Sequence, residues 1–390
     1  MNQSKELVYV GRHHPSGDAA PGTPAVPPAS SPATSLTLAD ALRLAEGRRR
    51  APTLLQLVNR CQSSGAKEHV TVETVFVDRG HPFDIIHPRR EFHVERIGSL
   101  RVLWLEDPHS EWFLACFPSG YERVYHLVSS IHSTDPRWKQ AGRWINAARG
   151  VVRPFLNHTD FESIGTGLAS YGDVEVGRVS ARSALDGSSD SRGWKALEGQ
   201  LRPTHTDVIQ SMEHQGFSVR TLTLHVADAL SVHLRRMAGA TYYSGSFELF
   251  VSKVLDPLAR AASERRSLLS GKERKRSDAV HPVSIRLNAE QLVGADSTGE
   301  LIREVASLPK TTVAVFHRNP YLHLAVSDEV DGSNFDIMVT ASNSIDIYPG
   351  FRATSGALSR LLDHLSDRFG GRSVAERSEH SYSLDELSLG

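Results

Sequence analysis

Two copies of the tripeptide His-Thr-Asp are the residues of this chain whose types best suit catalysis. Each copy follows an Arg-Pro pair. Histidine nitrogens and carboxylates together bind divalent metal ions, and a bound metal activates water for hydrolysis. If the two copies meet in the fold, they supply the ligands of a metal-dependent hydrolase or nuclease, namely His158, Asp160, His205 and Asp207.

The same tripeptides also have a purely structural interpretation. Thr and Asp are favoured at helix N-termini, where their oxygens accept hydrogen bonds from free backbone N–H groups. Thr206-Asp207 precedes a predicted helix that ends at His214, and His158 lies in a polar loop. The chain has no Walker A, HExxH, GxSxG or GxGxxG motif. We therefore expect a protein that is not an enzyme and needs no cofactor or metal.

A cationic segment, residues 135–153, is the strongest indication of a binding surface. Asp135-Pro136 is typical of a helix start, and Pro154 disfavours helix at the residue before it. At 100° per residue, one face of the predicted helix is apolar and comprises Ala141, Trp144, Ile145, Ala148, Val151 and Val152. The opposite face carries Lys139, Arg143, Arg149 and Arg153. Such a face suits nucleic acid, although many amphipathic helices are simply solvated there.

A second basic cluster lies between Arg260 and Arg276, at the end of a helix predicted from Ser246 onwards. Tyr242 and Tyr243, which follow Arg235-Arg236, lie just upstream. Aromatic rings interleaved with arginine are typical of grooves for single-stranded nucleic acid. The predicted contacts in this cluster are Arg265, Arg266, Lys272, Arg274, Lys275 and Arg276.

The overall charge restricts how nucleic acid could be bound. The chain has 390 residues and a formal net charge of −1, so any attraction to a polyanion has to come from local patches. Of its basic residues 36 are arginine and 8 are lysine, a bias that a GC-rich bacterial genome also produces. Cys61 and Cys116 form no CxxC pair, and neither a signal peptide nor an apolar run of membrane-spanning length occurs. These features predict a cytoplasmic protein without membrane contact.

Composition and periodicity predict an α+β protein with two or three mixed domains and mostly antiparallel sheets. The predicted divisions are a disordered Pro-rich arm (1–35), a helical hairpin (36–65), an N-terminal α+β domain ending in the cationic helix (66–155), a middle α/β unit with a basic loop (156–280), a C-terminal α+β domain (281–371) and an acidic tail (372–390). We expect removal of the arm and of residues 373–390 to leave stability unchanged, because both lack apolar content.

Within these divisions, alternation of apolar and polar residues predicts the main elements. The N-terminal domain should contain a β meander followed by a helix near Tyr121–Ile131. The C-terminal domain should have the order strand, helix, four strands, helix, with Gly370-Gly371 ending the last helix. A strand–turn–helix pattern recurs at 112–131 and 345–369 but is too short to indicate duplication.

The resulting hypothesis is a non-catalytic accessory protein that contacts nucleic acid through its local basic patches. Two alternatives stay open. One is the metal-dependent hydrolase or nuclease built on the His-Thr-Asp copies. The other is a scaffold or assembly subunit whose flexible tails recruit a protein partner.

Overall fold

Two antiparallel sheets with helices packed on them make up the described part of the chain, which confirms the α+β class. The computed structural model describes residues 36–46, 49–65, 69–88, 90–107, 110–183, 189–193, 203–272, 281–287, 292, 295–318 and 321–376. The chain divides into Met1–Thr34, which lies outside these residues, and one unit comprising Ser35–Gly390. The predicted arm (1–35) therefore lies outside the described residues, as does the tail from residue 377 onwards.

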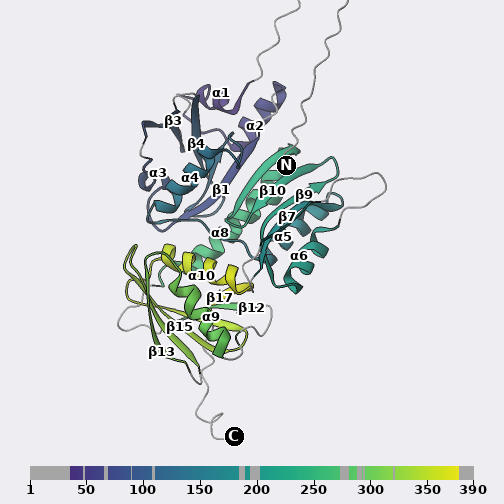
Figure 1. Ribbon diagram of the computed structural model, residues 1–390. Helices are drawn as coiled ribbons and strands as arrows, with labels where there is room; N and C mark the ends of the chain where they lie inside the picture. Colours follow the sequence, from purple (N-terminus) through teal and green to yellow (C-terminus); the bar gives the residue numbers. More distant parts are fainter. Residues whose placement is uncertain are drawn as a thin grey trace, which may run out of the picture. The chain divides into compact units, whose positions relative to one another are not determined.

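Eleven of the described strands form the first sheet (Figure 1). In spatial order they are β2 (Phe92–Ile97), β3 (Leu100–Asp107), β4 (Ser110–Pro118), β5 (Val124–Ser129), β1 (Val70–Val77), β11 (Gly239–Gly245), β10 (Leu230–Arg235), β9 (Phe217–Val226), β7 (Val174–Ser183) and β8 (Ser189–Gly193), with β6 (Val151–Val152) also paired to β1. The pairing of β1 with β11, in which Val70 faces Tyr242, joins the two halves of this sheet.

Helices cover the first sheet because its strands have apolar faces to bury. They are α1 (Leu38–Arg43), α2 (Leu54–Ser63), α3 (Pro82–Ile85), α4 (Pro136–Ala147), α5 (His158–Ala169), α6 (His205–His214), α7 (Phe247–Phe250), the π-helix η1 (Val251–Leu255) and α8 (Asp256–Leu269). One face of the sheet shares a core with α1, α2, α5, α6 and α7. On the other face, α3 and α4 cover only the half formed by β1 and β3–β5.

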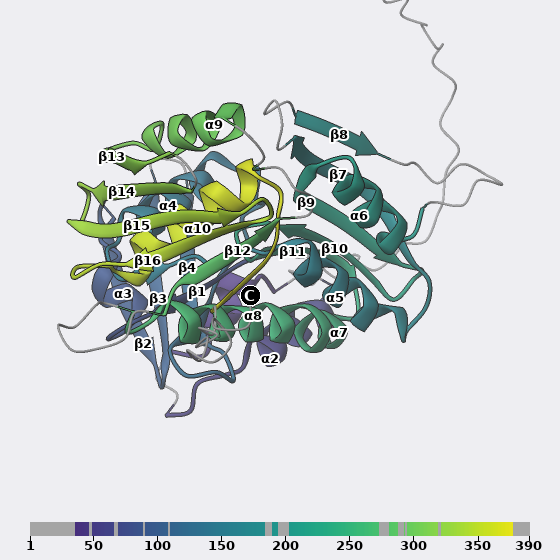
Figure 2. The same ribbon diagram turned by 90° about the horizontal axis from the view of Figure 1, so that it is seen from below.

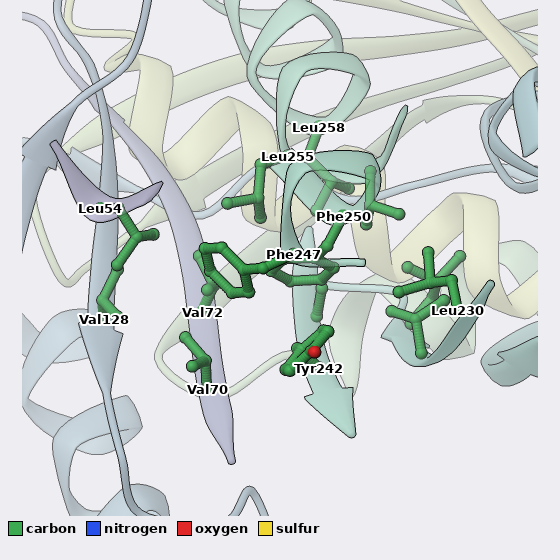
Figure 3. Close-up of a cluster of buried hydrophobic side chains, with 14 of the residues drawn as sticks. Leu54, Val70, Val72, Val128, Leu230, Tyr242, Phe247, Phe250, Leu255 and Leu258 are labelled. Atoms are coloured by element: carbon green, nitrogen blue, oxygen red, sulfur yellow. The ribbon is translucent and has the colours of Figure 1, made fainter. Parts of the chain in front are cut away.

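The junction of β1 and β11 lies under the α7–η1–α8 helix (Figure 3). Val70, Val72 and Tyr242 meet Phe247 and Phe250 there, all of them buried. A π-helical turn spans Val251–Leu255 just before Pro257. Proline has no N–H to donate within a helix, and a widened turn accommodates that loss, so the helix continues past Pro257.

Six of the described strands form the second sheet. In spatial order they are β13 (Thr311–His317), β14 (Leu322–Asp328), β15 (Ser333–Ala341), β16 (Ser344–Pro349), β12 (Val283–Leu287) and β17 (Gly371–Glu376), with the helices α9 (Ala295–Ala306) and α10 (Ser355–Arg368). The predicted strand and helix order of this region is confirmed, with β17 in addition. Figure 2 shows α10 lying along this sheet.

The second sheet repeats the topology of the first half of the chain. The order β1-α3-β2-β3-β4-β5-α4-β6 matches β12-α9-β13-β14-β15-β16-α10-β17 element by element. In both, the first strand lies beside the fifth, and the strand after the second helix pairs with the first strand. The sequence pattern at 112–131 and 345–369 does not correspond to this repeat, because it aligns β4–β5 with β16–α10.

The polar loop predicted at His158 was wrong, because His158 is the first residue of α5. Three further sequence predictions of secondary structure were also wrong. Residues 124–129 form β5 rather than a helix near Tyr121–Ile131. β5 lies between β4 and β1 and is buried on both faces, so it lacks the alternation that marks a strand. The cationic helix ends at Ala147, since Gly150 turns the chain at a φ of +90° and Val151–Val152 pair with β1.

The third error concerns the start of the tail, because residues 371–376 form β17 rather than a polar extension. Val374 is buried in the second core, so removal of residues 373–390 should lower stability, and the expectation that it would leave stability unchanged was wrong. We expect Val374→Asp to destabilise the protein by about 2–4 kcal/mol, since it buries an unpaired carboxylate. The neighbouring Ala375 is exposed, so Ala375→Asp should change stability by less than about 0.5 kcal/mol. Urea denaturation of both variants measures this, and equal effects would contradict the burial of β17.

Candidate nucleic-acid interface

The two His-Thr-Asp copies occupy equivalent structural positions, at the first turns of α5 and α6. His158 and His205 are the first residues of these helices, after the N-caps Asn157 and Thr204. The Asp160 carboxylate accepts a hydrogen bond from the Asn157 N–H at 2.8 Å, and the Asp207 carboxylate accepts one from the Thr204 hydroxyl at 2.7 Å. Both aspartates therefore have helix-capping roles.

The histidines of the two copies are engaged in packing. The His158 Nε2 accepts a hydrogen bond from the Val219 N–H at 3.2 Å, and the His205 ring lies against Gly165 of α5. Asp160 also pairs with Arg265 at 3.2 Å. Within the described residues, which include all four proposed ligands, no group of His, Cys, Asp and Glu is arranged to hold a metal ion. The metal-site hypothesis therefore has no geometric support.

The polar side of the half-sheet formed by β7, β9, β10 and β11 is a better candidate for a binding surface than the two His-Thr-Asp copies. Alternation along these strands directs their apolar residues toward α5 and α6. The opposite side carries half-buried or exposed polar residues, and no apolar core cluster of the described residues covers it. We call this surface the polar sheet face; it comprises Arg178, Ser180, Thr221, Thr223, His225, Ser231, His233 and Tyr243.

Hydrogen bonds across the strands fix the side chains of the polar sheet face. The Thr223 hydroxyl and the His233 Nδ1 are 3.0 Å apart, and the Ser231 hydroxyl and the His225 Nδ1 are 3.1 Å apart. Burial, with the nearby Arg235, lowers the pKa of His233 from 6.5 to about 4. The imidazole of His233 is therefore neutral near pH 7, so this part of the surface presents an uncharged ring beside hydroxyls.

An aromatic cluster of three rings stands at the β1–β11 end of this face. His132 stacks on Tyr243 with ring centroids 5.8 Å apart, and His69 approaches both rings edge-on at 5.6 and 5.9 Å. Burial lowers the pKa of His132, and His69 and Arg235 lower it further. Because His69, His132 and Tyr243 come from separate segments, no local sequence pattern pointed to this cluster.

A buried network of charged residues lies next to the aromatic cluster. Glu73, only 2% exposed, pairs with Arg153 at 2.5 Å and with Arg235 at 3.4 Å. Arg235 also donates to the Thr241 hydroxyl at 2.9 Å and lies over the Trp138 ring of α4 at 5.9 Å. Arg153 in turn donates to the Asn146 side chain at 3.0 Å. These contacts hold one flank of α4 against the edge of the polar sheet face.

Two residues of the predicted cationic helix lie along that flank. Lys139 and Arg143 precede Asn146 at the i, i+4, i+7 spacing that shares one side of a helix. Both are exposed, and neither has an ion-pair partner among the described residues. We name Lys139 and Arg143, with Arg178 of β7, the cationic rim of the polar sheet face. Arg178 is exposed and hydrogen-bonds the Ser191 hydroxyl at 3.3 Å.

The other predicted contacts are engaged elsewhere or lie outside the described residues. Arg149 follows the helix and donates to the Val330 carbonyl at 2.5 Å, whereas Arg153 belongs to the buried Glu73 network. Arg265 is buried against Asp160, the Arg266 Nε is also buried, and Lys272 pairs with Glu376 at 2.8 Å. Arg274, Lys275 and Arg276 lie outside the described residues.

The tyrosines beside the second basic cluster have different environments. Tyr242 is buried in the first core, where its hydroxyl donates to the Gly245 carbonyl at 2.5 Å. Tyr243 points to the opposite side of β11 and is only half-buried. Arg236, also buried, pairs with Asp363 of α10 at 3.0 Å. Of the Arg-Arg and Tyr-Tyr pairs, only Tyr243 is therefore placed to contact a ligand.

No protein-family model matches the sequence, and no curated protein is detectably similar to it. Among the described residues, no helix combines the length and the apolar composition needed to cross a membrane.

Buried neutral histidines predict a loss of stability in acid. Burial lowers the pKa of His158 from 6.5 to about 4 in the folded state. The unfolded chain takes up a proton below about pH 6.5 while the folded protein does not, so stability falls as the pH drops from about 6.5 to about 4. His158 alone accounts for a loss on the order of 3 kcal/mol over this window.

The histidine variants separate this effect from general acid sensitivity. His158→Gln keeps a hydrogen-bond acceptor for Val219 but cannot take up a proton, so its unfolding free energy should fall less between pH 7 and pH 4.5. His214 is exposed at the end of α6, and His214→Gln should follow the wild-type profile. Urea denaturation across the pH series measures the unfolding free energy of both variants. Parallel pH profiles for His158→Gln and the wild type would show that protonation of His158 does not cause the loss of stability in acid.

Proposed function

We propose that this protein is a non-catalytic binding protein that holds single-stranded nucleic acid on its polar sheet face. The observation that carries the proposal is the aromatic cluster of His69, His132 and Tyr243 at one end of an uncovered polar strand surface. Single-stranded nucleic acid binds proteins by stacking its bases on aromatic rings while cations follow the phosphates. Burial lowers the pKa of His132 and raises that of Tyr243, so both rings are uncharged near pH 7 and suit stacking on any base.

The cationic rim supplies the positive charges that such a site needs to contact the phosphates. Lys139 and Arg143 border the polar sheet face from α4, and Arg178 borders it from β7. Cations without a carboxylate partner attract phosphate most strongly, because no ion pair has to be broken first. A chain with a net charge of −1 needs such a local patch to bind a polyanion.

The proposal keeps the accessory role in the bacterial cytoplasm that the sequence predicts. Cys61 and Cys116 are both buried and free, as is usual for thiols of cytosolic proteins. The metal-dependent hydrolase finds no support in the capping roles of Asp160 and Asp207. A protein scaffold is the outcome that we would adopt if nucleic acid does not bind.

Charge reversal on the rim tests the electrostatic part. Lys139→Glu combined with Arg143→Glu should leave folding intact, since both side chains are exposed. Each phosphate contact contributes about 0.7 to the log–log salt slope for a single strand, so the double variant should flatten the slope by about 1.4. Fluorescence anisotropy with labelled single- and double-stranded oligonucleotides, from about 50 to 200 mM salt, measures this.

The matched control for this variant is the pair Arg303→Glu and Lys310→Glu. These cations are exposed in the second-sheet region, and the net charge changes by the same amount. If the control variant weakens binding as much as the rim variant, the net charge of the protein attracts the nucleic acid and the cationic rim has no specific role. If the wild type binds neither oligonucleotide at about 50 mM salt, the proposed function is wrong.

Removing one ring tests the stacking part. Tyr243→Ala should weaken single-strand binding about tenfold or more, because stacking of one base on an aromatic ring is worth roughly 1–3 kcal/mol. Tyr243→Phe retains the ring and should bind like the wild type. Tyr171 is an exposed tyrosine on the helical side of the sheet, so Tyr171→Ala should have no effect. Loss of affinity in Tyr243→Phe would assign the effect to the hydroxyl and contradict stacking.

A further inference from the structure

A cavity lies on the side of the first sheet opposite the polar sheet face, at the start of α2. Its volume is about 300 Å³, which is the lower end of the range for small-molecule sites. The β2–β3 turn, the end of β4 and the π-helical turn of η1 form the rest of its wall. Its main apolar lining is Leu54, Leu55, Leu100, Phe117, Val251 and Leu255.

Two ionisable side chains with different properties are part of the described lining of this cavity. His126 on β5 is buried, and its Nδ1 is 3.1 Å from the Thr74 hydroxyl. The Nε2 on the far side of the ring is therefore the nitrogen left for a bound molecule. Burial lowers the pKa of His126 from 6.5 to about 4, so the ring is neutral near pH 7. It can exchange a hydrogen bond but adds no charge.

Among the described lining residues, Asp256 at the start of α8 is the one carboxylate. It is exposed, and among the described residues no cation lies within ion-pair distance of it. An unpaired carboxylate beside an apolar cavity attracts a cationic group whose apolar part enters the cavity. No arginine or lysine belongs to the described lining of this cavity.

The wall of the cavity depends on two unusual backbone features. Gly98 in the β2–β3 turn has a φ of +61°, and a Cβ atom there would lie 2.6 Å from the Ala51 nitrogen. Only glycine lets this turn approach the segment before α2 so closely. On the other side, η1 is π-helical, and π-helical turns are frequent at functional sites. The widened turn carries Val251 and Leu255 and leads directly into Asp256.

We propose that this cavity binds a small molecule with an apolar body and a cationic amino group. The body fills the space between Phe117, Leu54 and Leu255, and the ammonium group pairs with Asp256 at the rim. This site is separate from the polar sheet face, so it is independent of the proposed function. Failure of one leaves the other intact.

Three probes of the same shape test the proposal: 4-phenylbutylamine, 4-phenylbutanol and 4-phenylbutyrate. Titrations of the full-length protein followed by ligand-observed NMR give their dissociation constants. The amine should bind about fivefold more tightly than the alcohol, the gain expected of one exposed ion pair. The carboxylate should bind more weakly than either. Equal affinities for the three probes, or no binding at millimolar concentration, would overturn the proposal.

Two variants locate the binding and one serves as control. Asp256→Asn should remove the preference for the amine while the alcohol binds as before. Ser99 is exposed in the β2–β3 turn and lines the cavity, so Ser99→Phe should fill the space and abolish binding of both. Asp228→Asn changes an exposed carboxylate that is not part of the lining and should have no effect. Binding that survives both Asp256→Asn and Ser99→Phe unchanged would place the probes elsewhere and overturn the assignment.

Discussion

The burial of β1 on both faces is the constraint on which the rest of the structure depends. Every residue of this strand is buried, and it pairs with β5 on one edge and with β11 and β6 on the other. Glu73 stands in its middle, and a buried carboxylate without a partner would cost several kcal/mol. Arg153 and Arg235 neutralise it, so the position of one charge fixes both the segment after α4 and the strand β10.

The polar sheet face follows from that arrangement. α3 and α4 cover β1 and β3–β5 on the side toward which Glu73 points, but they do not extend over β7, β9 and β10. The uncovered strands carry polar residues on this side because nothing there requires apolar ones. Strand alternation therefore directs the chemistry of the polar sheet face, and the Glu73 network places Lys139 and Arg143 at its border.

The sequence predicted those parts of the fold in which one face of an element meets water. β10 alternates cleanly between buried and half-buried residues, and its strand was predicted. β5 was missed because both of its faces are buried, which removes the alternation. β17 was missed because its short polar sequence is strand-like only through its pairing with β12, far away in the chain. Pairing of this kind leaves no local signal.

The candidate site could be predicted only in part for the same reason. Lys139 and Arg143 stand out because helical periodicity is local. The aromatic cluster combines residues from three distant segments, and its members look ordinary in the sequence. Nor does the sequence reveal which cations already have a partner. The sequence alone does not distinguish Arg153 and Arg265 from Arg143. Arg153 and Arg265 each form an ion pair with a buried or half-buried carboxylate.

The repeated topology has a consequence for the order in which the chain is assembled during synthesis. In the second copy, β12 finds its neighbour strands β16 and β17 within one continuous stretch. In the first copy, β1 meets β5 early, but β11 is made only after the whole of β7–β10. Most of one edge of β1 therefore stays unpaired until β11 has been synthesised, and non-local strand pairing of this kind is slow. The short strand β6 covers Phe76 and Val77 in the meantime, which leaves Val70–Glu73 as the stretch where a nascent chain is most open to mispairing.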